Sequence, residues 1–282
     1  MPESIVPYDK TLPYIEDRNP WEISVSYLKK KAVNEYELIQ GRRPSKMLIV
    51  NKLRSDIDRW RNDGYPGATA TSQELLAYWF EQSHPPVFGN EPFHFYFCQR
   101  EAVETIIYLY EIKKYTDVIP LIEDYHEKYM ATLFSSVIEF SEDLDGRRKV
   151  KRYFPELNQE GEQELPEKDL LRYAVKMATG SGKTFVMAFV VVWSYFNRLR
   201  EKDRRYANNF LLVAPNVIVY ERLAKDFANG KVFEEFPFVP TAWKSKWKLN
   251  IKLRGDESPL AAENNLIVNN IHQLYESRAK EF

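Results

Sequence analysis

Residues 177–184, Met-Ala-Thr-Gly-Ser-Gly-Lys-Thr, have the residue types and the spacing of a phosphate-binding loop. Gly180 and Gly182 allow backbone conformations that a side chain disfavours, so backbone N–H groups can face an anion at the start of a helix. Lys183 would reach the β- and γ-phosphates of a nucleotide, and Thr184 would hold Mg²⁺. The predicted nucleotide-binding residues of this loop are Thr179, Gly180, Ser181, Gly182, Lys183 and Thr184. The non-functional alternative is a turn rich in glycine and serine with an incidental lysine.

The sequence around the loop predicts the elements that must position it. Apolar residues 173–175 predict a strand over 171–177, and the apolar run after Lys183 predicts a helix over 183–200. Further predicted elements are strands at 210–214, 243–253 and 266–268 and a helix at 217–228. Apolar strands that alternate with helices indicate an α/β fold, with a parallel sheet covered on both faces.

The residues before 170 predict a mainly helical region. The predicted elements are a strand at 47–50, a helix through Leu53, Ile57 and Trp60 that stops at 62–67, helices at 72–83 (capped by Thr71), 99–115 and 117–142, and an exposed charged loop at 141–169. We therefore expect an accessory region at 1–95, a helical insertion with the charged loop at 96–169, and a partial P-loop domain at 170–282.

Composition sets bounds on the class of protein. The chain has 282 residues, 44% apolar and 15% aromatic, so it can bury a sizeable core. Its longest apolar run, 185–193, is shorter than the roughly 20 residues of a membrane span, and the start of the chain lacks a secretory signal pattern. The single cysteine, Cys98, excludes an intrachain disulfide, so we expect a reducing, cytoplasmic setting. With 40 basic and 41 acidic residues, any nucleic-acid binding must depend on local patches.

The phosphate loop also carries a resemblance to a known family. Met177 occupies the place of the first glycine in the commoner loop form, and the whole segment resembles the first motif of DEAD/DEAH-box helicases and of the type III restriction enzyme Res subunit. The resemblance extends from Trp60 to Leu274 in separate segments. It implies a RecA-like P-loop fold, ATP and Mg²⁺ as cofactors, and an ATPase that acts as a helicase or translocase on DNA.

The resemblance assigns a role to Gln99, which stands 84 residues before Lys183. In helicases of this type, a glutamine in such a segment reads adenine, because a side-chain amide offers the base both a donor and an acceptor. Without the resemblance, Gln99 is a residue near a helix N-terminus with no assigned chemistry.

Two segments are candidates for nucleic-acid contact. Pro215 and Asn216 follow the strand at 210–214 and resemble a motif that touches the phosphates of a bound strand, although a proline there is also an ordinary strand terminator. Residues 243–254 alternate apolar and basic side chains, which predicts a strand with a basic face. The face would carry Lys246, Lys248 and Lys252. It could follow a phosphate backbone, or its lysines could be a solvated edge that prevents aggregation.

Residues 266–272 imitate the acidic motif of these helicases, but with Asn269 and Asn270 in place of the two acids. Neutral amides cannot provide the charge that Mg²⁺ binding and proton abstraction need. We interpret this segment as the strand before the acidic motif, the alternative being a degraded motif.

The sequence is therefore expected to be an amino-terminal fragment that is catalytically incomplete by itself. The expected partners are DNA, a second RecA-like domain or separate subunit, and a methyltransferase or specificity subunit. Two alternative functions stay open: a nucleotide-binding adaptor without turnover, and a small-molecule kinase, which the loop form and Gln99 disfavour.

Overall fold

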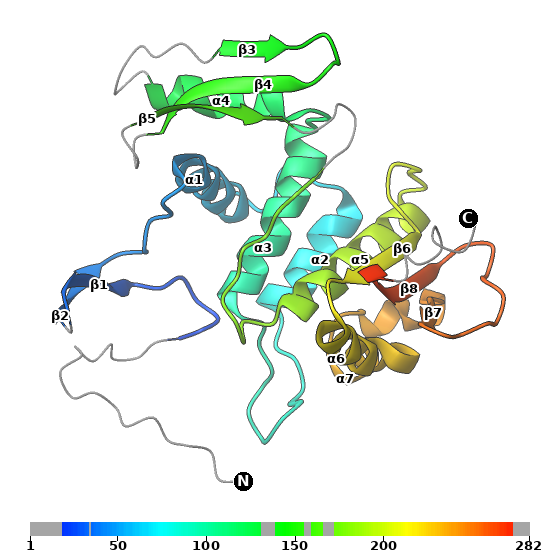
Figure 1. Cartoon of the computed structure of the whole chain (residues 1–282). Helices are drawn as coiled ribbons and strands as arrows, with labels where there is room; N and C mark the ends of the chain where they lie inside the picture. Colours follow the sequence, from blue (N-terminus) through cyan, green and yellow to red (C-terminus); the bar gives the residue numbers. More distant parts are fainter. Residues whose placement is uncertain (1–18, 34, 131–138, 155–158, 166–171, 273–282) are drawn as a thin grey trace. The chain divides into compact units, whose positions relative to one another are not determined.

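A computed structural model of the chain describes residues 19–33, 35–130, 139–154, 159–165 and 172–272 (Figure 1). The chain divides into two compact units: Met1–Asp56 with Asp117–Leu170, and Ile57–Thr116 with Leu171–Phe282. Among the described helices, none has both the length and the apolar character that crossing a membrane requires. The domain boundaries expected after residues 95 and 169 stay a prediction.

The first unit contains a two-stranded and a three-stranded sheet, the helix at 118–130 and the first part of the helix at 48–62. Its elements are β1 (Ser26–Ala32), β2 (Glu35–Gln40), α4 (Val118–Met130), β3 (Glu139–Glu142), β4 (Arg148–Phe154) and β5 (Gln159–Glu164). β1 and β2 pair antiparallel, and β3, β4 and β5 form a second antiparallel sheet in that order.

The prediction of an exposed charged loop over 141–169 is wrong, because β3, β4 and β5 occupy much of this segment. The strand register places Glu142 opposite Arg148 and Lys149 opposite Glu164. Opposite charges that face each other across strands stabilise a sheet, so the charges that indicated a loop belong to strands. The helix predicted at 117–142 ends at Met130, residues 131–138 lie outside the described part, and Glu139 begins β3.

α1 (Leu48–Asn62) contributes residues to both units and replaces the strand predicted at 47–50. Ile49 lies four residues before Leu53, and Ile57 and Trp60 continue the same helical spacing, so Ile49 of the apolar run lies on the apolar face of this helix. The helix ends at Asn62, as predicted from the turn residues that follow it.

The second unit contains the predicted phosphate loop. Its further elements are α2 (Ala70–Glu81), α3 (Phe97–Ile107), the π-helix η1 (Tyr108–Lys113), α5 (Lys183–Arg200), β6 (Asn209–Ala214), α6 (Val217–Phe227), η2 (Ala228–Gly230), α7 (Lys231–Glu235), η3 (Thr241–Lys246), β7 (Asn250–Leu253) and β8 (Asn265–Asn270). Its strands form a parallel sheet in the order β6-β8-β7, and α6 packs against β6 and β8. Figure 1 shows α2, α3 and α5 side by side, in agreement with their contacts.

Two predictions for this unit are wrong in part. Residues 172–178 form neither helix nor strand, and the side chains of Tyr173 and Val175 are 39% and 41% exposed. A strand requires a hydrogen-bonded neighbour, and the described residues provide none for this segment.

The α2 helix begins two residues before the predicted start at residue 72. Thr69, not Thr71, caps it by accepting a hydrogen bond from the Ser72 N–H.

Aromatic side chains form the core of the second unit. The Phe189 ring of α5 lies 4.6 Å from the Phe95 ring, 4.7 Å from the Trp79 ring and 4.8 Å from the Phe238 ring, measured between centroids. The Trp79 indole N–H donates a hydrogen bond of 2.7 Å to the Phe238 carbonyl. These contacts join α2, α5 and the segment before η3 around one buried ring.

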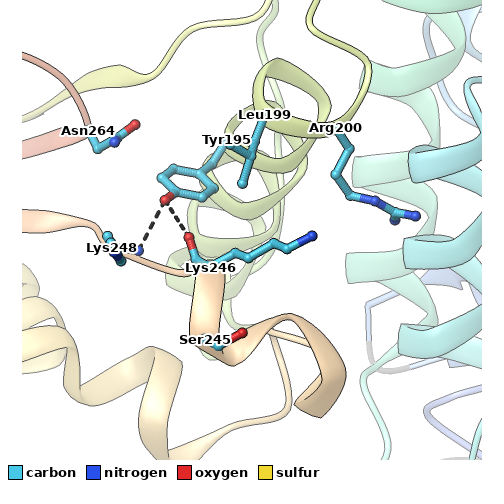
Figure 2. Close-up of a pocket in the computed structure, with 7 residues that line it drawn as sticks. All are labelled: Tyr195, Leu199, Arg200, Ser245, Lys246, Lys248 and Asn264. Carbon is cyan, nitrogen blue, oxygen red and sulfur yellow. Dashed lines mark hydrogen bonds between the residues drawn. The ribbon is translucent and has the colours of Figure 1, made fainter.

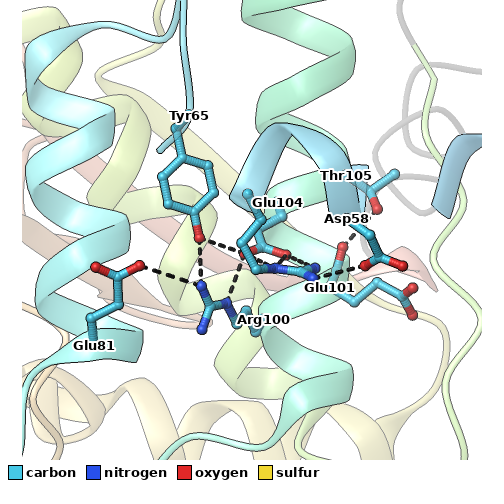
Figure 3. Close-up of polar contacts among 8 residues, drawn as sticks. Asp58, Tyr65, Glu81, Arg100, Glu101, Glu104 and Thr105 are labelled. Atoms are coloured by element: carbon cyan, nitrogen blue, oxygen red, sulfur yellow. Dashed lines mark hydrogen bonds and ion pairs between the residues drawn. The ribbon is translucent and has the colours of Figure 1, made fainter. Parts of the chain in front are cut away.

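A buried carboxylate joins α3 to the end of α1. Glu104 is fully buried and accepts hydrogen bonds from the guanidinium groups of Arg61 and Arg100 and from the Tyr65 hydroxyl (Figure 3). Burial and the neighbouring carboxylate raise the pKa of Tyr65, so its phenol remains a donor. Two cations and a phenol offset the cost of removing Glu104 from water.

A second buried carboxylate joins η1 to α2 and α5. Glu111 accepts hydrogen bonds from the Ser72 hydroxyl at 2.5 Å, the Trp193 indole at 2.9 Å and the Tyr206 hydroxyl at 2.9 Å. The Thr69 backbone N–H donates a fourth bond at 2.9 Å. Glu104 and Glu111 thus hold α3 and η1 at two places seven residues apart.

The buried His84 generates a prediction about stability and pH. Burial lowers the pKa of this imidazole. Hydrogen bonding to the Trp79 and Tyr78 carbonyls raises the pKa but does not cancel the effect of burial. Below the unfolded pKa of about 6.5 the unfolded chain therefore binds more protons, so the free energy of unfolding should fall as the pH is lowered from about 7 to about 5.5. In urea titrations, His84→Gln should make this fall smaller.

The exposed His272 supplies the matched control, because it is not among the groups that shift the His84 pKa. His272→Gln should keep the pH dependence of the wild type. An equal pH dependence in His84→Gln and wild type would contradict the prediction.

Candidate nucleotide-binding site

The phosphate loop meets the start of α5 at two glycines with left-handed backbone conformations. Gly180 has a φ of +79°, and Gly182, the residue that caps α5, has a φ of +76°. Side chains disfavour this region, which explains why the sequence has glycine at both places. The first N–H groups of a helix have no partner within the helix, so the beginning of α5 offers donors and a partial positive charge to an anion.

The loop closes on the carbonyl oxygen of Ala178. The Lys183 ammonium donates to this oxygen at 2.7 Å, and so does the Ser181 hydroxyl, also at 2.7 Å. Lys183 is nevertheless exposed, and Thr184, the next residue of α5, is partly exposed. A phosphate group that entered the loop would therefore compete with one backbone carbonyl for the Lys183 ammonium.

The structure brings Gln99 against this loop. Gln99 is 3% exposed, and its Nε2 donates a hydrogen bond of 3.0 Å to the Ser181 carbonyl. Its Oε1 accepts a 3.0 Å bond from the Tyr96 N–H at the start of α3. Each end of the amide therefore makes one bond, and each keeps the capacity for a second one, which a base could use only by reaching this buried side chain. That role stays a prediction.

Gln99 gives a second reason for the glycine at 182, which the sequence alone did not reveal. A Cβ atom at this position would overlap Gln99 Nε2, whereas a Cβ atom at Gly180 would meet open space. The family resemblance had assigned Gln99 to the same nucleotide site as the loop, but it gave Gln99 a contact with the base and did not predict a direct contact with the loop.

The donor set of the loop fits a nucleotide triphosphate with its Mg²⁺ ion. The open side of Gly180 leaves room for a phosphate, and the Lys183 ammonium with the α5 N-terminus supplies positive charge. The Thr184 hydroxyl would be the protein ligand of Mg²⁺, an ion that neutralises phosphate charge and orients the oxygens when it is bound.

The predicted nucleic-acid residues Pro215 and Asn216 lie at the carboxyl end of β6. Both are exposed, and the Asn216 side chain caps α6 by accepting a 2.9 Å hydrogen bond from the Val219 N–H. Asn270, in register with Ala214, is fully buried at the same sheet edge, and its Oδ1 accepts a 2.7 Å bond from the His272 N–H. Nucleic-acid contact by Pro215 and Asn216 stays a prediction.

The continuous strand predicted over 243–253 is wrong. The segment begins as η3, and β7 starts only at Asn250. Trp243 and Trp247 pack on the Phe196 ring of α5, at centroid distances of 4.8 Å and 5.7 Å. The packing of these two rings holds the segment against α5 and prevents one basic face from forming.

The three lysines of that predicted face consequently have different surroundings. The Lys252 side chain is mostly buried and contacts Asp256 and Ser258, so its charge is already compensated. Lys246 and Lys248 are exposed and line a pocket beside the end of α5.

Comparison with known proteins identifies a family. The family model described as type III restriction enzyme, res subunit, matches residues 95–282, a span that includes Gln99, the phosphate loop and the parallel sheet. This match confirms the resemblance that the loop indicated. No curated protein and no solved structure matches the chain.

The position of Gln99 beside Gly182 predicts different effects of alanine at the two glycines of the loop, and Gly180→Ala serves as the control for Gly182→Ala. Gly180→Ala and Gly182→Ala both place alanine at positive φ, which costs about 1–2 kcal/mol in each case. Gly182→Ala must also displace Gln99 and break its hydrogen bond to Ser181, so it should destabilise the chain by about 1 kcal/mol more. Urea unfolding of both variants measures this difference.

The same two substitutions in a Gln99→Ala background complete the test, because the overlapping side chain is then absent. The difference between the glycine variants should disappear there. A difference that persists unchanged would show that Gln99 does not constrain residue 182.

Proposed function

Because the chain belongs to the type III restriction enzyme res-subunit family of DEAD-like helicase domains, we propose that it binds Mg²⁺ and ATP through residues 177–184. In this proposal it is the nucleotide-binding part of a DNA-dependent ATPase of the helicase or translocase type, with a RecA-like P-loop domain and a cytoplasmic setting. The observation that carries the proposal is the loop itself: two left-handed glycines, Lys183 and the start of α5 converge on one open site.

The proposed binding step is an exchange of partners at Lys183. Its ammonium leaves the Ala178 carbonyl and binds the β- and γ-phosphates, and the Ser181 hydroxyl is released from the same carbonyl. The Thr184 hydroxyl, on the second residue of α5, would hold the Mg²⁺ that accompanies the triphosphate. The exchange conserves hydrogen bonds at the lysine and adds charge pairing, which favours the bound state.

The position of Gln99 supports a role in sensing the nucleotide. Its amide already connects the Tyr96 N–H to the Ser181 carbonyl, so a base bound beside α3 would meet a donor and an acceptor next to the phosphate loop. Exchange of either bond for adenine would couple base recognition to the position of the loop.

The first test measures ATP-dependent stabilisation of the folded chain. With Mg·ATP at a hundredfold excess over its dissociation constant, the folded state should gain about 2.7 kcal/mol, seen as a rise in Tm. Lys183→Ala should lose most of this gain, because the cation that binds the β- and γ-phosphates is absent. The exposed Lys176, just before the loop, gives the matched control, and Lys176→Ala should retain the gain. Equal ATP-induced shifts in Lys183→Ala and wild type would contradict the proposal.

The second test separates base reading from positioning of the loop. Gln99→Ala removes the contact with Ser181, so affinity for every nucleoside triphosphate should fall to some degree. If Gln99 also reads adenine, ATP should lose more affinity than GTP, and the ATP-to-GTP preference should approach one. Calorimetric titration with both nucleotides provides this ratio, and an unchanged preference would leave Gln99 with a purely structural role.

A further inference from the structure

A pocket in the second unit lies beside the last turns of α5, away from the phosphate loop. It encloses about 580 Å³ and opens to solvent (Figure 2). Its lining residues are Tyr195, Leu199, Arg200, Ser245, Lys246, Lys248 and Asn264. They come from α5, from η3 and the turn after it, and from the residue before β8.

Tyr195 ties the lysine-bearing wall of the pocket to α5. Its hydroxyl donates a 2.7 Å hydrogen bond to the Lys246 carbonyl and accepts a 3.0 Å bond from the Lys248 backbone N–H (Figure 2). The Trp247 ring between these two lysines packs 4.7 Å from the Tyr195 ring. The backbone that carries both lysines is therefore held against the helix, while their side chains are exposed.

Arg200, the last residue of α5, also lines the pocket. Its guanidinium group lies 4.0 Å from the Trp243 ring centroid and forms hydrogen bonds of 2.8 Å and 3.0 Å with Glu74. The Glu74 carboxylate therefore compensates this cation, and the Trp243 ring and the ion pair together fix the orientation of the guanidinium group. Figure 2 shows the side chains of Arg200 and Lys246 extending in the same direction.

The charge of the pocket is unusual for this chain. Three of the seven lining residues are cations and none is acidic, whereas the whole chain has 40 basic and 41 acidic residues. Within the part of the chain that the structure describes, Lys246 and Lys248 make no ion pair, while Lys244 pairs with Glu234 at 3.8 Å. The two lysines of residues 244–248 that make no ion pair within the described residues therefore both line the pocket.

The pocket is separate from the candidate nucleotide site. Lys183 begins α5 and Arg200 ends it, so a rise of 1.5 Å per residue places them about 25 Å apart. The pocket also lies at the amino ends of the parallel strands, since Lys248 precedes β7 and Asn264 precedes β8, whereas Pro215 follows β6 at the carboxyl ends.

We infer that this pocket binds the phosphodiester backbone of a nucleic-acid strand, an inference that rests on the proposed action on DNA and assigns it a surface. Lysines bind phosphates as point charges without reading sequence, and the Ser245 hydroxyl and the Asn264 amide add neutral donors. An open pocket admits a polymer, whereas sites for free small molecules enclose most of the ligand surface.

The test measures binding of a fluorescein-labelled oligothymidylate of about 20 nucleotides by anisotropy over a range of salt concentrations. Each phosphate contact on a single strand contributes about −0.7 to the slope of log affinity against log salt. Removing Lys246 and Lys248 together, as Lys246→Gln with Lys248→Gln, should therefore weaken binding and flatten the slope by about 1.4. The control, Lys225→Gln with Lys231→Gln, removes the same charge from α6 and α7, outside the pocket, and should leave the slope near that of the wild type.

Two further measurements identify the cause of each result. Tm values and Mg·ATP titrations of both double variants should match the wild type, which separates a failure of the pocket from a failure of the nucleotide site. Inorganic tripolyphosphate, at equal phosphate concentration, should displace the oligonucleotide poorly if the pocket recognises a polymer backbone. Equal slopes in all three proteins, no binding by the wild type, or efficient displacement by tripolyphosphate would each overturn the inference.

Discussion

The contact between the Gln99 amide and the Ser181 carbonyl is the constraint on which the candidate nucleotide site depends. In the described residues no strand supports the loop from its amino side, because 172–178 has no regular structure. The loop is therefore positioned by the start of α5, by its own bonds to Ala178, and by Gln99. The same contact leaves no space for a side chain at residue 182, so it restricts both the sequence and the geometry of the site.

The position of Gln99 depends in turn on two buried carboxylates. Glu104 and Glu111 lie on α3 and η1 and bind donors from the end of α1, from α2 and from α5. A buried carboxylate without its donors is strongly destabilising, so each of these networks favours one placement of the helix. The helix that carries Gln99 is thus held at several points against the helix that begins at the phosphate loop.

The parts of the fold that could be predicted from sequence are those determined by local signals. The α5 helix follows from the loop and the apolar run after it, and β6 and β8 follow from short apolar runs beside turn residues. The strand predicted at 171–177 and the charged loop at 141–169 were wrong, because pairing between strands depends on partners distant in sequence.

The prediction of a continuous basic strand over 243–253 was wrong for a different reason. Trp243 and Trp247 are four residues apart, a spacing that fits both an alternating strand and a helical turn, and packing on Phe196 decided between the two. Within the candidate site, the loop residues could be named from sequence. The direct contact of Gln99 with Ser181 could not, because only the fold brings these residues, 82 positions apart, together.

Hydrogen–deuterium exchange with and without Mg·ATP is the measurement that tests the nucleotide site most directly. Binding at the loop predicts slower amide exchange in peptides covering residues 177–186, because N–H groups at the start of α5 become bonded to phosphate. Peptides from β1 and β2 should exchange at the same rate in both conditions. Unchanged exchange at 177–186 under saturating nucleotide would contradict the assignment of this loop as the ATP site.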